Sequence, residues 1–387
     1  MRDVRYGMIG GGEGAFIGAA HRAAARLAGH IVLVAGALSG DTERARRSGA
    51  AIGLAPERSY GTWHEMFAAE RELPPDQRME FVAIVTPNHV HALAAIAAME
   101  AGFHVLTDKP LADSLESAQL VSEAVKQTGR LLGITHTYTG YPMVKQARAL
   151  VARGALGAVR RVNVSYTQDW LSRATDTVGN KQAQWRTDPA RAGEAGAFGD
   201  IGTHAFNLVE YITGDRVARL CAELRAVVPG RDLDDDGSAL FHLSKGGAGT
   251  LSASQVCTGD INSLTVSIYC DEAGIHWRQE DPNTLHVRHR DKPAEVWTAG
   301  ANRPYLSPEA IGATRLPAGH PEGYLEAFAN IYGAFAGDVR NGIASAHPGY
   351  ATVADGIAAM RFIRAARRSS ERGAAWIDLS GAKDHTT

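Results

Sequence analysis

The chain has 387 residues, of which 45% are hydrophobic and 21% are charged, and its formal net charge is −2. This length allows two domains, each with its own core, and the nearly balanced charge offers no long-range attraction to nucleic acid or to an anionic membrane. The first residues lead directly into a strand, and no apolar run reaches the roughly 18 residues that a membrane span needs, so we expect a cytoplasmic protein with neither a nucleic-acid nor a membrane partner.

The first strand–turn–helix unit is rich in glycine. A predicted strand at residues 4–9 and a predicted helix at residues 19–27 enclose a glycine turn. In this context a G-x-G-x-x-G motif indicates dinucleotide binding, with the pyrophosphate at the helix N-terminus. Gly10 and Gly12 fit the first two glycines, but Gly18 becomes the third only after a three-residue insertion. The predicted cofactor contacts of this turn are Gly10, Gly12, Gly14, Phe16 and Ile17.

The second predicted strand, residues 31–38, ends where the adenosine ribose of a dinucleotide is read. An acidic residue there bonds the 2′-hydroxyl of NAD, whereas Ser with a nearby Arg accepts the 2′-phosphate of NADP. Ser39 occupies the position, Asp41 follows two residues later, and Arg44 lies in the next helical turn. Ser39 and Arg44 favour NADP, while an inward-pointing Asp41 would repel the 2′-phosphate. We predict NAD, with NADP as the open alternative, and Ser39 and Arg44 as cofactor contacts.

Three more strands alternate with helices before residue 136. The strands are residues 80–85, 103–106 and 131–135, and the helices are residues 92–101 and 114–128. This alternation implies right-handed crossovers and a doubly wound parallel sheet, whose ligands bind beyond the carboxyl ends of the strands. We therefore assign residues 1–135 to an NAD(P)-binding domain.

Two polar stretches, residues 86–91 and 107–110, follow strands at this edge. Lys109 is therefore expected to point toward the nicotinamide end of the crevice. The alternative is a surface lysine at a strand end. The predicted cofactor contacts at this edge are Thr86, Asn88, His91, Asp108 and Lys109.

From His136 the pattern changes to that of a second domain, residues 136–387. A helix at 142–153 precedes strands at 159–167, 217–228, 238–243, 249–256, 264–269, 274–279, 284–289 and 295–297, and helices at 323–340 and 352–370 follow. These runs predict an α/β domain with a large, open, mainly antiparallel sheet, and the last helix is also compatible with packing on the first domain. The single cysteines Cys221, Cys257 and Cys270 predict buried thiols in a reducing compartment.

Residues 199–204 place Asp200 and His204 four residues apart, just before the apolar run 205–211. If that run is helical, the two side chains share one face at its N-terminal end, where a histidine beside a carboxylate can exchange a proton with a substrate hydroxyl. The alternative is that Asp200 is only an N-cap and His204 a histidine satisfied within the fold. No metal-ligand spacing connects His89, His91, His136 and Glu210, so we expect no metal centre.

The ordered set of motifs resembles the Gfo/Idh/MocA oxidoreductases, the family of inositol dehydrogenases and glucose–fructose oxidoreductase, over essentially the whole chain. The motifs are the glycine turn followed by His21, Thr86-Pro87-Asn88 with His91, Asp108-Lys109-Pro110, and Asp200-x-Gly202-x-His204. The family usually has Glu where Asp108 stands, a change that keeps the charge. The resemblance implies a Rossmann fold for the first domain, an open α/β sheet for the second, and assembly into homodimers or homotetramers.

The resemblance also implies catalytic roles for three residues. His204 would act as the general acid/base, Lys109 would polarise the substrate oxygen or relay its proton, and Asp200 would orient the substrate or the imidazole. Aromatic faces and bidentate polar groups suit a polyhydroxylated ring. The predicted substrate contacts are Lys109, Tyr138, Trp185, Arg186, Asp200, His204 and His320.

We therefore predict an NAD(P)-dependent dehydrogenase that oxidises a secondary hydroxyl of a cyclic polyol or sugar, an inositol or a pyranose, to the ketone. Two alternatives use the same fold. One is redox-assisted glycoside cleavage with tightly held NAD, which would proceed without net NADH. The other is a cofactor-binding regulator without catalysis, and the joint presence of Lys109, Asp200 and His204 argues against it.

Overall fold

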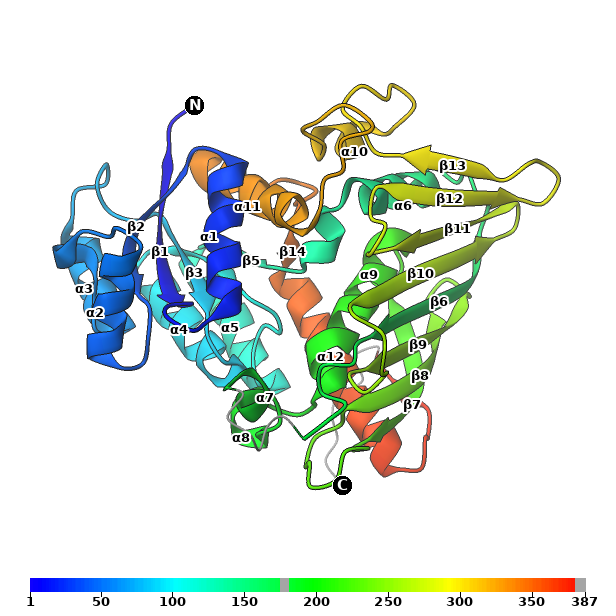
Figure 1. Ribbon diagram of the computed structural model, residues 1–387, viewed down its shortest axis with the longest axis horizontal. Helices are drawn as coiled ribbons and strands as arrows, with labels where there is room; N and C mark the ends of the chain where they lie inside the picture. Colours follow the sequence, from blue (N-terminus) through cyan, green and yellow to red (C-terminus); the bar gives the residue numbers. More distant parts are fainter. Residues whose placement is uncertain (175–180, 380–387) are drawn as a thin grey trace. The chain divides into compact units, whose positions relative to one another are not determined.

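The computed structural model describes residues 1–174 and 181–379 (Figure 1). Its contacts divide the chain into two compact units. The first contains Met1–Gly140 and Tyr324–Ile357, and the second contains Tyr141–Gly323 and the chain from Ala358 onward. Residues 136–140 and 324–357, assigned above to the second domain, thus cluster with the first unit. Among the described residues, no helix is long and apolar enough to cross a membrane.

The first unit is built on a six-stranded sheet with the order β14-β5-β4-β3-β1-β2. Its strands are β1 (Val4–Gly10), β2 (Ile31–Ala37), β3 (Phe81–Val85), β4 (His104–Thr107), β5 (Leu132–Ile134) and β14 (Ala351–Thr352). The first five run parallel, and β14 pairs antiparallel with β5. The parallel, doubly wound sheet predicted from the sequence is confirmed, and β14 is a strand that the sequence analysis missed.

The carboxyl ends of the central strands lie level with one another. Gly10 pairs with Val85, and Thr107 pairs with Ile84 on one side and with Ile134 on the other. Because β2 lies on one side of β1 and β3 on the other, the strand order reverses between β1 and β3. A doubly wound sheet binds its ligand outside the carboxyl ends at such a switch point.

Six α-helices belong wholly to this unit. They are α1 (Phe16–Ala28), α2 (Thr42–Ala51), α3 (Trp63–Glu72), α4 (Asn88–Glu100), α5 (Leu115–Thr128) and α11 (Tyr324–Asn341), with short 3₁₀ turns at Pro56–Arg58 and Thr137–Gly140. Asp41, Thr62 and Ser114 cap α2, α3 and α5 by accepting a backbone N–H with their side chains. Helix α1 starts after Ala15 without a side-chain cap.

Helix α11 joins the first unit through its aromatic face, which packs beside α1 (Figure 1). The Tyr332 ring lies 6.2 Å from that of Tyr6, and Phe328 packs edge-on against His21 at 4.5 Å. All four side chains are buried. The apolar pattern of this helix predicted its existence, and the sequence analysis placed it in the second domain, whereas its side chains pack into the core of the first unit.

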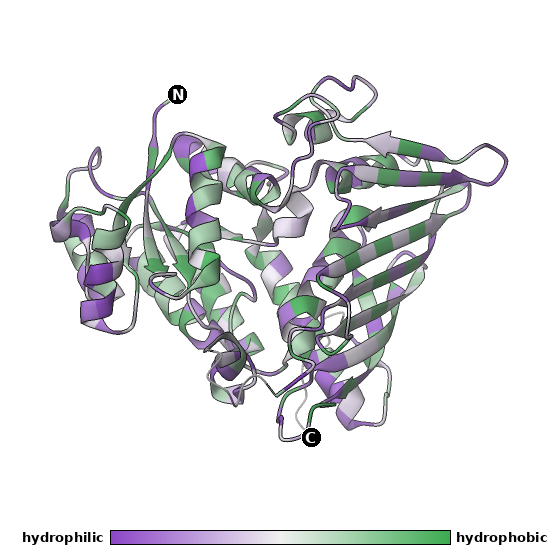
Figure 2. Ribbon diagram, viewed as in Figure 1, coloured by the Kyte–Doolittle hydropathy of each residue, from purple (hydrophilic) through white to green (hydrophobic). Residues whose placement is uncertain are grey.

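The second unit contains a nine-stranded sheet with the order β13-β12-β11-β10-β6-β9-β8-β7-β15. The strands are β6 (Val159–Thr167), β7 (Val217–Arg225), β8 (Asp236–Leu243), β9 (Ala248–Ser254), β10 (Ser263–Cys270), β11 (Ala273–Arg278), β12 (Thr284–His289), β13 (Glu295–Thr298) and β15 (Ile377–Asp378). Only the β6–β9 pair is parallel among these pairings. Polar and apolar residues alternate along the strands (Figure 2), and burial alternates with them. The predicted, mainly antiparallel sheet is confirmed.

The described helices of the second unit are α6 (Pro142–Ala152), α7 (Lys181–Arg186), α8 (Pro189–Ala192), α9 (Thr203–Thr213), α10 (Pro308–Gly312) and α12 (Val353–Glu371), the last of which runs from the first unit into the second. Helices α6 and α9 pack against strands of the sheet. Phe362 of α12 stacks on Phe198 and Phe206, with ring centroids 5.2 and 4.5 Å apart.

The three cysteines are free thiols, but the prediction that they are buried is wrong. Each is half-buried. Cys221 occupies a half-exposed position of the alternating strand β7, and Cys270 ends β10.

His104 makes the stability of the protein sensitive to acid. Its Nδ1 accepts the N–H of Leu131 at 2.9 Å. Burial, followed by the charge of Arg130, lowers the pKa of this ring to about 4 against the opposing charge of Glu80. An unfolded histidine has a pKa of about 6.5, so below that pH the unfolded chain binds a proton that the folded chain does not. The neutral ring therefore contributes stability above about pH 6.5 that is lost as the pH falls toward 4.

We predict that His104→Asn reduces this pH dependence, because the Asn carbonyl keeps an acceptor for Leu131 and removes the titrating group. The slope of the free energy of unfolding against pH, measured by urea unfolding from about pH 4.5 to 6.5, should fall by an amount that corresponds to the uptake of up to about one proton on unfolding. The matched control is the exposed His347, whose replacement by Asn should leave the slope as in the wild type. An unchanged slope in His104→Asn would contradict the assignment.

Candidate functional site

The glycine turn of the first unit is as tight as a dinucleotide-binding turn requires. Gly10 has φ 76°, and a Cβ there would lie 2.4 Å from the carbonyl oxygen of Val85. A Cβ on Gly18 would lie 2.2 Å from the carbonyl oxygen of Gly11. Gly18 is thus the glycine that lets helix α1 approach the turn, and the insertion before it leaves that role intact.

Three features of this turn fit the pyrophosphate of NAD. The first N–H groups of α1 face no side-chain cap, so they remain available to an anion. The Arg22 guanidinium donates to the carbonyl of Gly11 at 2.8 Å, and the Ser48 hydroxyl accepts the N–H of Glu13 at 3.0 Å, which fixes the loop. Within the described ranges, the hydroxyl of Thr86 is buried without a hydrogen-bond partner. The sequence analysis missed Arg22 and Ser48, because their partners are backbone atoms distant in the chain.

The outer predicted contacts of this turn lie at or near the surface. Phe16 is 78% exposed at the start of α1, whereas Ile17 is half-buried against the core. A Cβ on Gly12 would lie 2.5 Å from the carbonyl of Leu38, while a Cβ on Gly14, which has φ 78°, would meet no described atom within 4 Å outside its chain neighbours.

The predicted adenosine contacts surround the start of α2. Asp41 caps this helix by accepting the N–H of Arg44 at 2.8 Å, and its own N–H donates to the Ser39 hydroxyl at 3.1 Å. Asp41 and Arg44 are exposed, and Ser39 is half-buried. A carboxylate is thereby fixed next to Ser39 at the end of β2.

Several contacts fix the Asp108 carboxylate at the carboxyl edge of the first unit's sheet. Its Oδ1 accepts the backbone N–H of Lys109 at 2.8 Å and the Thr135 hydroxyl at 2.9 Å, and its Oδ2 lies 3.8 Å from His21 Nε2. Nδ1 of His21 in turn lies 2.8 Å from the Tyr332 hydroxyl. Burial alone would raise the pKa of Asp108, but the His21 ring and the charge of Lys109 outweigh it and hold this pKa well below its usual range.

Lys109 lies among buried histidines at the end of β4. Burial, followed by the positive charge of Lys109, lowers the pKa of His136 to about 4, so this ring is neutral at pH 7. Both ring nitrogens of His91 lie 2.8 Å from backbone carbonyls, one of Thr86 and one of Pro110, and burial lowers its pKa. His91 therefore lies between the segments that follow β3 and β4, and its neutral ring donates its one N–H to one of these two carbonyls. Asn88 is buried in the first turn of α4.

In the second unit, Asp200 lies in a π-helical turn, Phe198–Gly202, that leads directly into α9. Its Oδ2 accepts from Arg186 Nε at 3.2 Å and from Gln255 Nε2 at 3.0 Å. The cap residue of α9 is Gly202, so the alternative that Asp200 is only an N-cap is wrong. A π turn inside a helix frequently marks a functional site.

Arg186 connects this carboxylate to two indole rings. Its guanidinium carbon lies 4.2 Å from the ring centroid of Trp185 and 5.7 Å from that of Trp170. Trp170 Nε1 donates to Gln168 Oε1 at 3.0 Å, and Gln255 Nε2 reaches the same oxygen at 3.2 Å. A carboxylate, a guanidinium, two indoles and two carboxamides thus form one connected cluster.

The connected cluster continues toward His204. Gln168 and the Tyr166 hydroxyl each donate to Asn262 Oδ1 at 2.7 Å. The ring of Tyr166 lies 6.3 Å from that of His204, which is 9% exposed. Gln255 and Asn262 were not among the predicted site residues. Gln255 lies just beyond β9, which ends two residues earlier than predicted.

Tyr138 and His320 are the remaining predicted substrate contacts. Tyr138 belongs to the first unit, where its ring is 5% exposed and lies 6.4 Å from that of Tyr324. His320 is exposed, and its Nδ1 faces the carbonyl of Pro317 in its own loop. The neighbouring Glu322 accepts backbone N–H groups of this loop rather than serving as a first-turn charge of α11.

No group of three or more His, Cys, Asp or Glu side chains is arranged to hold a metal ion in residues 1–174 and 181–379.

Two family models match the chain. Residues 4–136 match an oxidoreductase family with an NAD-binding Rossmann fold, and residues 144–276 match the GFO/IDH/MocA C-terminal domain. An uncharacterized oxidoreductase of Bacillus subtilis, YfiI, is 30% identical to this chain over 98% of its length and 97% of the relative. A levoglucosan dehydrogenase of Pseudarthrobacter phenanthrenivorans is 29% identical over 74% of this chain and 76% of the relative.

Among solved structures, an inositol dehydrogenase homolog from Azotobacter vinelandii, complexed with NAD+, matches with a TM-score of 0.92 and 32% identity, covering 97% of each chain. The complex of such a homolog from the same organism with NADH and myo-inositol matches with a TM-score of 0.88 and 31% identity, covering 97% of this chain and 98% of the other.

We predict that Gly18→Ala weakens NAD binding by on the order of tenfold or more, because the new methyl group would collide with the backbone of Gly11 and push α1 from the turn. Binding can be measured by calorimetric titration at constant temperature. The matched control is Gly337→Ala, where a Cβ meets none of the described atoms within 4 Å. Wild-type affinity in Gly18→Ala would rule out this turn as the pyrophosphate cradle.

Proposed function

Because the chain belongs to the Gfo/Idh/MocA family of oxidoreductases, with an NAD-binding Rossmann fold, we propose that it oxidises a secondary hydroxyl of an uncharged cyclic polyol or sugar, an inositol or a pyranose, to the ketone. The observation that carries the proposal is the cluster around Asp200. Its carboxylate, indole faces and carboxamides are the groups that suit a ring bearing several hydroxyls. The proteins that the chain is similar to include one complexed with myo-inositol and one named for levoglucosan.

Three residues are assigned to the chemical step, and NAD supplies the hydride acceptor when bound. We assign His204 to take the proton of the substrate hydroxyl, since a neutral imidazole is a base of suitable strength near pH 7. We assign Lys109 to stabilise, through its ammonium group, the negative charge that develops on the substrate oxygen. Asp200, held by Arg186 and Gln255, accepts a hydrogen bond from a neighbouring substrate hydroxyl and so fixes the ring for reaction.

We further propose NAD rather than NADP as the preferred cofactor. The Asp41 carboxylate is fixed at the start of α2, beside Ser39. A negative charge at this position disfavours a 2′-phosphate, whereas it can accept a hydrogen bond from a 2′-hydroxyl. Arg44 contributes its backbone N–H to the cap, and its side chain is exposed.

The test is the initial rate of absorbance increase at 340 nm with NAD and with NADP, across inositols and D- and L-pyranoses. We expect reduction of NAD with at least one polyol. Lys109→Ala and His204→Ala should each lower kcat by about 10²- to 10⁴-fold. The matched control is Lys126→Ala, at an exposed position near the end of α5, which should retain wild-type rates.

Binding of NADH, followed by its fluorescence, shows whether an inactive variant still holds the cofactor. A flat panel from wild-type protein that binds NADH would contradict the dehydrogenase proposal. Release of an aglycone from a glycoside without net reduction of NAD would instead establish redox-assisted glycoside cleavage.

A further inference from the structure

The loop between β7 and β8 holds the chain segment that leads to Asp200. The Asp234 carboxylate accepts the N–H of Gly196 at 2.8 Å and the N–H of Phe198 at 2.7 Å, one with each oxygen. The backbone carbonyl of Asp234 accepts the N–H of Ala197 at 2.8 Å. One residue therefore fixes three consecutive backbone amides.

These amides lie at the entrance to the π-helical turn. Phe198 is the first residue of that turn, and Asp200 follows two residues later. The contact is close, because a Cβ on Gly196 would lie 2.0 Å from the carbonyl oxygen of Asp234. A shift of this segment away from the loop would carry Asp200 with it, since only one residue separates Asp200 from the last anchored amide.

The next residue of the loop anchors the second partner of Asp200. The Asp235 carboxylate is 1% exposed as a residue and accepts the N–H groups of Val227 and Val228 at 2.7 and 3.0 Å. Its backbone carbonyl accepts the N–H of Gln255 at 2.8 Å, and Gln255 donates its side-chain amide to Asp200 at 3.0 Å. The β7–β8 loop thus fixes two segments: the one that leads to Asp200 and the one that carries Gln255, the partner of Asp200.

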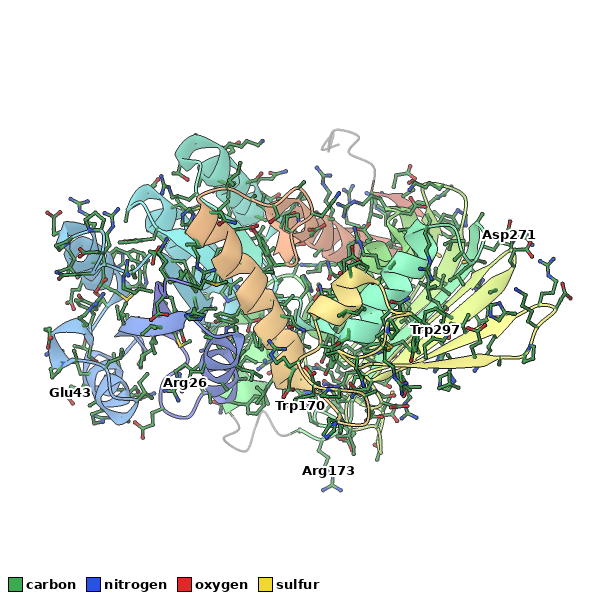
Figure 3. The ribbon with its side chains drawn as sticks, turned by 90° about the horizontal axis from the view of Figure 1, so that it is seen from above. Arg26, Glu43, Trp170, Arg173, Asp271 and Trp297 are labelled. Carbon is green, nitrogen blue, oxygen red and sulfur yellow. The ribbon has the colours of Figure 1, made fainter. Side chains whose placement is uncertain are left out.

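Arg231 extends this anchoring to a third segment, the one after Trp170. Its guanidinium, 2% exposed, pairs with Asp235 at 2.9 Å and donates to the carbonyls of Leu171 and Arg173 at 2.8 and 2.9 Å. Figure 3 shows the Arg173 side chain extending away from the protein, so the backbone makes the contact. Because a buried guanidinium without these acceptors would leave an unpaired charge inside the protein, the contacts hold the segment in place.

We propose that the β7–β8 loop is a positioning element for the site and that Asp234 is its principal positioning residue, setting the place of the Asp200 carboxylate in the second unit. The proposal rests on the proposed role of Asp200 in substrate binding. Asp234 acts through the backbone of residues 196–198 and is not itself a catalytic residue.

The ionised form of Asp234 is the one that can hold both amides. Burial, with a contribution from the charge of Asp235, raises the pKa of Asp234 to about 6 against the opposing effect of the N–H donors. At pH 8 the side chain is therefore a carboxylate with two acceptor oxygens. An Asn side chain has one acceptor and would turn an NH₂ group toward the second backbone N–H.

The test compares Asp234→Asn with Asp232→Asn at pH 8. Asp232 is exposed in the same loop, so its replacement removes a nearby charge and serves as the matched control. In Asp234→Asn we expect the amides of Gly196 and Phe198 to lose protection from hydrogen–deuterium exchange. We also expect kcat to fall by about ten- to a hundredfold, the order of loss that an ångström-scale misplacement causes, while KM for NAD changes by less than about twofold. The control should match the wild type in all three measurements.

Gly196→Ala is a second variant that perturbs the same contact from the other side, because its methyl group would collide with the Asp234 carbonyl. Gly196→Ala should lower kcat while leaving KM for NAD nearly unchanged, and it tests the proposal even if Asp234→Asn does not fold. Retained protection at residues 196 and 198 in Asp234→Asn, or lost protection with unchanged kcat, would overturn the proposal. A third outcome separates the two proposals. If the wild type reduces no cofactor with any polyol but Asp234→Asn still loses amide protection, the proposed function is contradicted, while the placement of residues 196–198 by Asp234 is supported.

Discussion

The carboxylate of Asp200, held between Arg186 and Gln255, is the interaction on which the account of the second unit depends. A partly buried carboxylate needs compensating donors, and here they come from two segments distant in the chain. The pairing draws α7, the π turn and the end of β9 into one arrangement.

In the first unit, too, a carboxylate with several donors fixes the chain next to a site residue, at the end of β4. Asp108 collects the backbone N–H of Lys109, the Thr135 hydroxyl and the nearby His21 ring, so that the chain around Lys109 is fixed by a carboxylate that stays ionised. Asp108 stands where the family usually has Glu, and these contacts show that the shorter side chain still organises the turn. A rigid backbone at Lys109 limits where its ammonium can reach, as preorganised charge stabilisation requires.

The sequence predicted those parts of the protein that depend on local pattern. Apolar runs located the strands of both sheets except the two-residue strands β14 and β15, and the position of Lys109 after a buried strand put it at the carboxyl edge. Arg186 was among the predicted site residues, but Gln255 could not be found in this way, because it lies 55 residues from Asp200 and a glutamine after a strand carries no local signal. Helix α11 was assigned to the second domain from its place in the chain, because an amphipathic pattern does not specify the partner core; its aromatic packing against Tyr6 and His21 assigns it to the first unit.

The central claim is that a carbinol hydrogen of a cyclic polyol or sugar is transferred as hydride to NAD. The most direct measurement is mass spectrometry of the reduced cofactor after turnover of the active polyol or pyranose carrying deuterium at single ring carbons. We predict that one labelled position, and no other, gives deuterated NADH, with a primary isotope effect on the rate where chemistry limits turnover. Reduced cofactor without deuterium from every labelled position would contradict hydride transfer from a ring carbon.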